Sequence, residues 1–431
     1  MLIQFNVTNV FSFKEQSELS MVASAIKEKR DVNTFNAGGL CLLKSAAIYG
    51  KNASGKSNFL SALYFMKHFV KSSVNEMDDG QEAREFSNCF KLDEESESLP
   101  LSFEISILLD GNKYRYGFQL GRQSIINEWL FCAPKKKEHR LFVRTNTNEF
   151  DISDKFSEGN GLEKKTRIDA LFLTVCSQFN GEISKSISKW FGSMNLYLHS
   201  NASRFPTLRG MEKDPTLTQR VSALLTNLDT DIEKIELEKV ATDSVQVGFP
   251  SDIPDDIKHR IMEVHSTKII TFHRKFNKDN SDSLVKFDLY EDESGGTIKI
   301  FHLAGPILEA LAEGRILVVD ELEAKLHPKI TRYLIGLFNS NETNPNNAQL
   351  IFSTHDVTLL DKEIMRRDQM WFVEKDRYGA SKLFSLDEFK IDDDKIRNDA
   401  SYSKAYMAGR YTAIPRISKD TSELLKRKPN E

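Results

Sequence analysis

A glycine-bounded stretch near the front of the chain has the residue types and spacing of a phosphate-binding loop. Residues 50–57 read Gly-Lys-Asn-Ala-Ser-Gly-Lys-Ser, which fits the G-x-x-x-x-G-K-S/T pattern in full. Glycines let backbone N–H groups turn toward an anion without side-chain clash, and a following helix adds its positive end. Lys56 is expected to reach the β- and γ-phosphates, and the Ser57 hydroxyl to ligate Mg²⁺. The predicted nucleotide contacts are Gly50, Asn52, Ser54, Gly55, Lys56, Ser57 and Asn58.

An acid pair follows a short apolar run much later in the chain. Residues 316–321 read Ile-Leu-Val-Val-Asp-Glu, so the two acids emerge at the carboxyl end of a buried strand, where open α/β sheets bind ligands. We expect Asp320 to hold the magnesium ion and Glu321 to orient or deprotonate the attacking water. Taken alone, an apolar strand that ends in two acids is common. Together with the phosphate loop, the pair predicts nucleotide hydrolysis.

His355 occupies a comparable place after another apolar run. Residues 352–356 read Phe-Ser-Thr-His-Asp. A histidine at this position is expected to contact the γ-phosphate and to report its presence. The alternative is a structural histidine, which would be the plainer reading without the acid pair upstream.

A second glycine turn stands at residues 294–297, which read Ser-Gly-Gly-Thr and open a predicted helix. Such a turn is another anion-binding device. Each device needs its own helix terminus, so Ser294, Gly295 and Gly296 are not expected to serve the nucleotide of the same chain's phosphate loop. The economical hypothesis is that they cap the nucleotide of a second, identical subunit. The alternative is an ordinary helix N-cap.

The elements that must position these residues follow from apolar periodicity. Residues 45–49 predict a strand, and residues 56–72 carry apolar side chains at three-to-four spacing, which predicts a helix. An opening strand is expected within 2–13, and a hairpin around Asp110-Gly111-Asn112. Residues 168–240 look helical, with strands returning near 267–290. Further buried strands are expected at 315–320, 348–356 and 369–376.

The fold expected is α/β, with a mainly parallel core sheet, N-terminal antiparallel strands and a mostly helical insertion. The predicted parts are an N-terminal lobe with the phosphate loop at 1–150, the insertion at 151–284, and a C-terminal lobe with the glycine turn, acid pair and histidine at 285–431.

Composition limits the other function classes. The chain has 431 residues, a net charge of −4 and 4 widely spaced cysteines. These values argue against a strongly basic nucleic-acid binder, and neither a zinc site nor a disulfide framework is indicated. No apolar run approaches the about 20 residues of a membrane helix, and the first residues lack the order of a signal peptide. We therefore expect a cytoplasmic protein that does not contact membranes.

The segments GKNASGKSN, SGGT, ILVVDELEAKLHP and STHD together resemble the ABC-type ATPase head shared by SMC proteins, RecF and the OLD family. The chain is most similar to stand-alone AAA-type ATP-binding proteins of the RloA/AbiLi kind, over about the first 120 residues and about 285–415. The resemblance implies ATP and Mg²⁺ as ligands and an ABC-type P-loop head. It also implies Walker A roles for Lys56 and Ser57, and Walker B roles for Asp320 and Glu321. It gives His355 the switch role and Ser294–Gly296 the signature role, and it places the dimer-contacting loop at 323–327. No glutamine-loop residue is assigned.

Four hypotheses for the function stay open. The first is an ATPase switch that dimerises around ATP, or forms a higher homo-oligomer, and serves an anti-phage (abortive infection) system beside a separate effector protein. The second is an OLD-like nuclease, for which Asp392, Asp393, Asp394, Glu374 and Glu388 would be candidate metal ligands. The third is a RecF-like DNA-repair clamp, which would bind nucleic acid. The fourth is an ATP-gated scaffold in which hydrolysis is incidental.

Overall fold

The computed structural model describes residues 1–75, 88–135, 137–198, 205–228, 230–239, 266–278, 281–388 and 401–411. Asp392–Asp394, the acids on which the nuclease hypothesis depends, lie outside the described residues. Within the described part of the chain, no helix is both long and apolar enough to span a membrane.

The core is a six-stranded sheet in the order β11-β15-β16-β5-β17-β18. Its parallel strands are β11 (Asn195–Tyr197), β15 (Ile316–Val319), β16 (Gln349–Ser353), β5 (Ser45–Tyr49) and β17 (Met370–Lys375). The edge strand β18 (Ser381–Ser385) runs antiparallel to β17. Every residue of β5, β15 and β16 is buried, because both faces of a mainly parallel sheet are covered. The predicted mainly parallel core sheet is confirmed.

A second, antiparallel sheet comes largely from the N-terminal part and has the order β10-β9-β8-β7-β6-β1-β2. Its strands are β1 (Leu2–Thr8), β2 (Ser17–Ser20), β6 (Leu101–Leu109), β7 (Asn112–Leu120), β8 (Ile125–Ala133), β9 (His139–Thr145) and β10 (Glu149–Ile152). The predicted hairpin is β6–β7, and Asp110 (φ 50°) with Gly111 (φ 79°) forms its turn. Close by lie the helix α1 (Arg30–Asn33) and the strand pair β3 (Thr34–Ala37) and β4 (Leu40–Leu43).

The long helix α2 (Lys56–Ser72) lies between these two sheets. Phe59 packs on Phe5 of the antiparallel sheet with ring centroids 5.4 Å apart, and Phe69 packs on Phe118 at 5.3 Å. The same cluster includes Ile48 of the core sheet. The helices α4 (Phe172–Gln178) and α5 (Glu182–Ser193) pack against α2. The helix that follows the phosphate loop is therefore held on two sides by apolar side chains.

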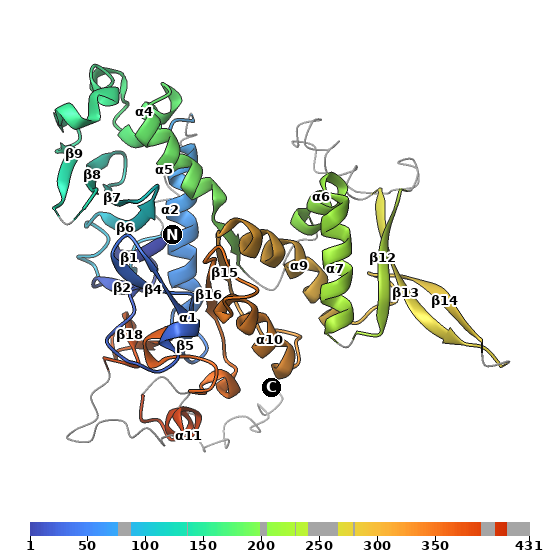
Figure 1. Ribbon diagram of the computed structural model, residues 1–431. Coiled ribbons are helices and arrows are strands. Elements are labelled where there is room, and N and C mark those ends of the chain that lie inside the picture. Colours follow the sequence, from blue (N-terminus) through green and yellow to red (C-terminus); the bar gives the residue numbers. More distant parts are fainter. Residues whose placement is uncertain are drawn as a thin grey trace, which may run out of the picture.

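The opposite face of the core sheet is covered by α9 (Gly295–Glu313), α10 (Pro328–Asn339) and α11 (Tyr402–Met407). Short 3₁₀ turns occur at η1 (Asp154–Gly159), η2 (Glu163–Lys165), η4 (Val357–Leu359) and η5 (Arg367–Gln369). A helix–sheet–helix layering results, with the antiparallel sheet beyond α2 (Figure 1).

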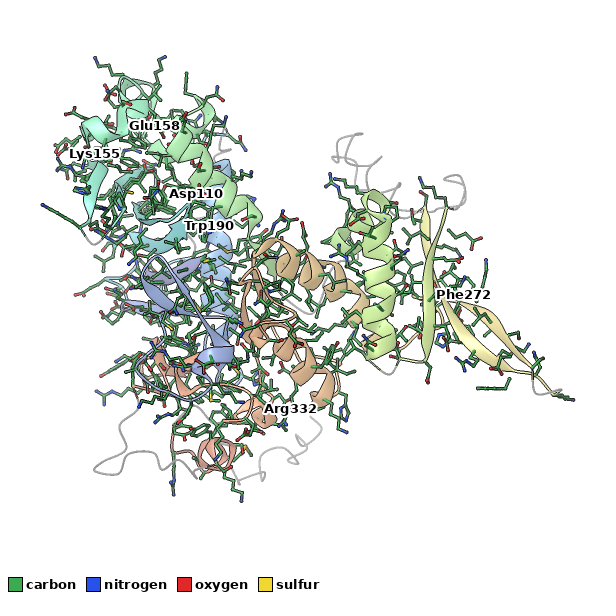
Figure 2. All side chains as sticks on the ribbon, in the orientation of Figure 1. Asp110, Lys155, Glu158, Trp190, Phe272 and Arg332 are labelled. Atoms are coloured by element: carbon green, nitrogen blue, oxygen red, sulfur yellow. The ribbon has the colours of Figure 1, made fainter. Side chains whose placement is uncertain are left out.

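An arm projects from α9, away from the antiparallel sheet (Figure 1). It consists of α6 (Phe205–Lys213), α7 (Pro215–Asn227) and a three-stranded sheet of β12 (Ile232–Lys239), β13 (Thr267–Phe276) and β14 (Asp282–Asp288). Phe272 lies on this sheet (Figure 2), with the ammonium groups of Lys234 and Lys286 at 4.2 and 5.8 Å from its ring centroid. The segment 151–284 thus contains the expected helices and, in addition, the arm sheet and β11 of the core sheet. The domain limits proposed from the sequence stay a prediction.

The arm is joined to α9 where Pro306 interrupts the helix. Pro306 has no N–H to donate to the carbonyl of His302. The Thr207 hydroxyl of α6 lies 3.0 Å from the carbonyl oxygens of Phe301 and His302, and it accepts a hydrogen bond from Gly305 N–H at 3.1 Å. A Cβ at Gly305 would come within 2.6 Å of Thr207 Cα, so glycine is what permits this close approach. The arm therefore satisfies backbone groups that the proline leaves without a helical partner.

Candidate functional site

The loop between β5 and α2 is closed in so tightly that only glycine fits at its two ends. A Cβ on Gly55, whose φ is 118°, would lie 2.5 Å from Ser381 Oγ and 2.7 Å from Ser12 Oγ. A Cβ on Gly50 would lie 2.6 Å from the backbone oxygen of Val373. Between them Asn52 is exposed, and Ser54 is buried with a hydroxyl that has no partner among the described residues. This backbone cradle therefore packs so closely against neighbouring protein atoms that its two end positions accept glycine alone.

Two serines that sequence reasoning missed brace this cradle from outside. The Ser381 hydroxyl donates to the carbonyl oxygen of Ser54 at 2.6 Å, and its oxygen lies 2.8 Å from Ser12 Oγ. The amide of Asn58 donates to the same Ser12 Oγ at 2.9 Å. Asn58, which was predicted to contact the nucleotide, is thus hydrogen-bonded to one of the two serines that support the loop. The serines lie 369 positions apart, and nothing in their local sequence indicates that they meet.

Lys56 points back across the loop. Its ammonium donates to the carbonyl oxygen of Gly50 at 2.9 Å and approaches His355 Nε2, also at 2.9 Å. Burial lowers the pKa of Lys56, and the nearby carboxylates of Asp320 and Glu321 oppose that shift. The ammonium is thus desolvated and surrounded by the predicted catalytic groups, although 299 positions separate it from His355.

The acid pair follows β15 directly. Asp320 is buried and accepts a short hydrogen bond from the Ser353 hydroxyl, and its own backbone N–H donates to Tyr197 O at 2.8 Å. Glu321 N–H donates to the same Ser353 Oγ at 2.8 Å. Glu321 has a φ of 49°, a left-handed conformation that costs a non-glycine residue about 1–3 kcal/mol. The end of β16 therefore fixes the backbone that aims both carboxylates.

Lys299 of α9 is a further charged residue next to the acid pair, and sequence reasoning did not predict it. Its ammonium donates to the backbone oxygen of Glu321 at 2.6 Å. Burial lowers its pKa to about 8, while Glu323 and Glu321 oppose the shift. The lysine links the helix of the second glycine turn to the residue predicted to act on water.

His355 lies at the end of β16 with its backbone N–H on Glu323 Oε1 at 2.6 Å. Partial burial of the ring and then the charge of Lys56 lower its pKa, against Glu323, Glu321 and Asp320. Because Lys56 is the donor, Nε2 is the acceptor and the neutral ring carries its proton on Nδ1. His355 Nε2 therefore occupies one of the acceptor positions around the Lys56 ammonium, and another acceptor could replace it there.

The second glycine turn lies elsewhere. Ser294 is the N-cap of α9, and its hydroxyl accepts from Thr297 N–H at 3.1 Å. A Cβ on Gly296 would come within 2.8 Å of the backbone oxygen of Lys325. Just before the turn, Glu293 Oε1 lies 2.6 Å from Thr271 Oγ1 and from His273 Nε2, both on the arm strand β13. Within the described residues, the contacts of this turn and of Glu293 before it join it to Lys325 and to the arm.

The structure thus brings together Lys56, Asp320, Glu321 and His355 around the loop. Ser294–Gly296 begin α9, which contacts the backbone of Glu321 through Lys299. The loop fits a triphosphate, because it leads into the N-terminus of α2, Lys56 supplies a desolvated positive charge and the Ser54 hydroxyl has no partner among the described residues. Ser57 and Asp320 offer the oxygen donors that Mg²⁺ prefers. Elsewhere in the described residues, no cluster of three or more His, Cys, Asp or Glu side chains is arranged to hold a metal.

A family model covers most of this architecture. The model described as "AAA domain, putative AbiEii toxin, Type IV TA system" matches residues 45–361, which include the loop, the acid pair and His355. The chain belongs to this AAA family. Membership agrees with the α/β fold and the phosphate loop, and a comparison with curated proteins finds no match.

Two solved SMC heads are similar to this AAA-family chain. One is the SMC head bound to the C-winged helix domain of ScpA, with 13% identity and a TM-score of 0.47 over 89% of this chain and 97% of that chain. The other is the SMC head domain from Thermotoga maritima, with 13% identity and a TM-score of 0.42 over 90% of this chain and 99% of that chain. At these values the likeness concerns the arrangement of elements alone.

Proposed function

We propose that this chain binds ATP with Mg²⁺ and hydrolyses it to ADP and phosphate. The observation that carries the proposal is the meeting of Lys56 with His355, next to the acid pair, at a loop shaped by Gly50 and Gly55. The loop backbone and Lys56 would hold the phosphates, and Ser57 with Asp320 would hold the metal. Mg²⁺ supplies positive charge against the phosphate oxygens. Glu321 would accept a proton from water, and His355 would contact the terminal phosphate.

Calorimetric titration with Mg-ATP tests this assignment. Wild-type protein is expected to release heat with a saturable isotherm, and Lys56→Ala to show none, because the loop loses its desolvated positive charge. A matched control is Lys51→Ala, which changes a lysine of the same loop whose ammonium has no assigned phosphate role. Equal binding by the Lys56→Ala protein would overturn the site, as would absence of binding by the wild type.

We further propose that two copies associate so that Ser294–Gly296 of one caps the nucleotide on the loop of the other. Support comes from the position of this turn at the start of a 19-residue helix, whose N-terminal N–H groups suit an anion. The biological proposal is a switch in an anti-phage system that acts with a separate effector; the family description itself names a putative toxin of a Type IV TA system. Loss of phage protection in cells carrying the Glu321→Gln protein would support a requirement for hydrolysis, and full protection would favour the ATP-gated scaffold.

Binding of nucleic acid is a second candidate, and a basic hollow favours it. A concave surface of about 800 Å³ between α5 and the end of α2 is lined by Lys71, Lys185, Lys189 and Arg315, with several serines. Ammonium, guanidinium and hydroxyl groups suit a phosphate backbone. Duplex DNA binding that weakens steeply with salt, and that is lost in a Lys185→Glu/Lys189→Glu protein, would support this function. Salt-independent or absent binding would exclude it.

A further inference from the structure

The sheet of the arm has an edge strand at β14. The strand order is β12-β13-β14, so among the described residues β14 is paired along one edge only. The strand lies on the outer side of the arm, far from the core sheet (Figure 1). A free strand edge presents a row of N–H and C=O groups that can pair with a strand of another chain. The backbone of β14 is therefore a candidate interaction surface.

The register of β14 decides which of its backbone groups face outward. Just after the strand, Leu289 N–H donates to Ile269 O at 2.9 Å. Residues of an antiparallel pair alternate between hydrogen-bonded and non-hydrogen-bonded positions, so the odd-numbered residues of β14 bond to β13. The N–H and C=O groups of Asp282, Leu284 and Lys286 therefore point away from β13, toward the free edge.

The free part of this edge ends at Asp288. Asp288 N–H donates to Asp292 Oδ2 at 2.7 Å, and Asp288 O accepts a hydrogen bond from Asp292 N–H at 2.9 Å. Both outward groups of Asp288 are thus occupied within the chain. The outward groups of Asp282, Leu284 and Lys286 have no such partner in the described part of the chain. Leu284 is therefore the middle of the free edge.

The side chains at these three positions are complementary to a second copy of themselves. They share one face of the sheet, and Leu284 in the middle is 50% exposed. When two β14 strands run antiparallel with Leu284 opposite Leu284, Asp282 of each copy stands opposite Lys286 of the other. Opposite charges at such positions are favourable. A shift by two residues would set Asp282 opposite Asp288, where like charges repel.

The partners of these charges within the chain leave them accessible. Lys286 Nζ lies 3.7 Å from Glu238 Oε2, and a guanidinium nitrogen of Arg274 lies 3.8 Å from Asp282 Oδ2. All four side chains are more than half exposed, and ion pairs of this kind contribute little to stability. Both charges can therefore pair with a second copy at little cost.

We propose that two copies of this chain pair through their β14 edges, antiparallel and with Leu284 opposite Leu284, so that one continuous sheet spans both arms. Each hydrogen-bonded pair of residues across this contact exchanges two backbone hydrogen bonds. Phe276, which is 78% exposed, stands opposite Asp282 on the same face as Leu284 and would add apolar area next to the contact. The contact lies on the arm and requires no nucleotide, so it goes beyond the proposed association around ATP.

Sedimentation of the full chain without nucleotide tests this contact. The wild type should form a reversible dimer at roughly 10–100 μM protein, as expected of a small interface. Lys286→Asp sets Asp282 of each copy opposite an acid and should raise the Kd of the dimer at least about tenfold. The matched control is Lys275→Asp, at an exposed lysine of β13 whose side chain lies on the other face, and it should leave the Kd within about twofold.

The register is tested by reversing both charges. Asp282→Lys alone should weaken the dimer as Lys286→Asp does. The Asp282→Lys/Lys286→Asp protein should restore the dimer, because each lysine again stands opposite an acid. A mixture of the two single variants should form mixed dimers for the same reason. No rescue in the double variant, or no mixed dimers, would overturn the pairing centred on Leu284.

Other outcomes would overturn the contact itself. A wild type that stays monomeric, or a Lys286→Asp protein that dimerises as the wild type does, would exclude the β14 edge as the place where copies meet. Dimers that form only with Mg-ATP would place association at the nucleotide sites instead. Lys56→Ala, which is expected to abolish ATP binding, should dimerise like the wild type without nucleotide. Failure of the ATP site and failure of the arm contact are thereby told apart.

Discussion

The glycine turns before α2 and before α9 both stand at helix N-termini, and their surroundings differ. The turn before α2 is enclosed by side chains of the same chain, with Ser12 and Ser381 outside it and Lys56 and His355 across it. The residue before the α9 turn, Glu293, is hydrogen-bonded to the arm strand β13. Further along α9, near Pro306, the helix is hydrogen-bonded to α6. The chain therefore surrounds the turn before α2 with polar and charged groups of its own. The turn before α9 is instead hydrogen-bonded to the arm through Glu293.

This difference suggests a separate role for each of the two turns. The first turn would bind and hydrolyse, and the second would sense whether another copy and its nucleotide are in place. Lys299 of α9 contacts the backbone of Glu321, so the two regions meet at the residue predicted to activate water.

The largest expected effect tests the enclosed site. Glu321→Gln should lower ATP turnover about 10²- to 10⁴-fold, because the amide does not accept a proton from water, while Mg-ATP binding is kept. Steady-state phosphate release and calorimetry measure the two quantities on the same preparation. Glu313→Gln, on an exposed part of α9, is the matched control. A turnover within twofold of wild type would remove Glu321 from the catalytic role.

The next effect tests whether the two turns serve one nucleotide from different copies. Lys56→Ala disables the loop, and Gly295→Asp places a negative charge in the other turn, where the nearest atoms belong to the flexible Lys325 side chain. Each protein alone should be inactive. An equal mixture should recover about a quarter of wild-type turnover, since half of randomly formed pairs contain one intact composite site out of two.

Recovery in the mixture must require association, so it should rise with protein concentration. The control is the Lys56→Ala/Gly295→Asp double variant mixed with the Lys56→Ala protein, because no pair in that mixture has an intact loop and no turnover should appear. No recovery at any concentration, with both single variants folded, would contradict the shared site.

A smaller effect tests the connection between arm and α9. Thr207→Val keeps the shape of the side chain but removes the hydroxyl that serves two backbone carbonyls and Gly305 N–H. Stability should fall by about 1–3 kcal/mol, as for buried polar groups left unpaired. Urea denaturation measures it. Thr218→Val, at a threonine of α7 whose hydroxyl has no hydrogen-bond partner among the described residues, should change stability by less than about 0.5 kcal/mol. Equal effects at both positions would contradict the special role of Thr207.

The smallest effect concerns pH at the contact between Lys299 and Glu321. The pKa of Lys299 is about 8 in the folded chain against 10.5 for a free lysine, so the unfolded chain holds the extra proton between these values. Folding stability from this group must therefore rise as pH increases from 8 toward 10.5. Relative to Lys299→Met, the wild type should gain about 1–2 kcal/mol between pH 7.5 and 9.5 in urea denaturation. A constant or falling difference would contradict the buried, desolvated ammonium.

Local patterns were sufficient to predict the elements that carry the site. Alternation and apolar runs predicted the core strands, the hairpin at Asp110–Gly111 and the helix after the loop, because each depends on residues close in sequence. They did not predict Ser12, Ser381 or Lys299, since a serine or lysine has no local signal for a partner hundreds of residues away. Nor did they place β11, three residues long, beside β15, because so short a strand has no periodicity. The predicted site roles of the individual residues stay predictions until the variants are measured.

The left-handed backbone of Glu321 has a practical consequence for anyone who engineers this chain. Glycine adopts that conformation without steric cost. Glu321→Gly would therefore relieve local strain and raise the free energy of unfolding. The same replacement would delete the carboxylate. A screen that selected only for resistance to heat or denaturant would therefore favour inactive variants of residue 321. ATP turnover has to be measured together with stability.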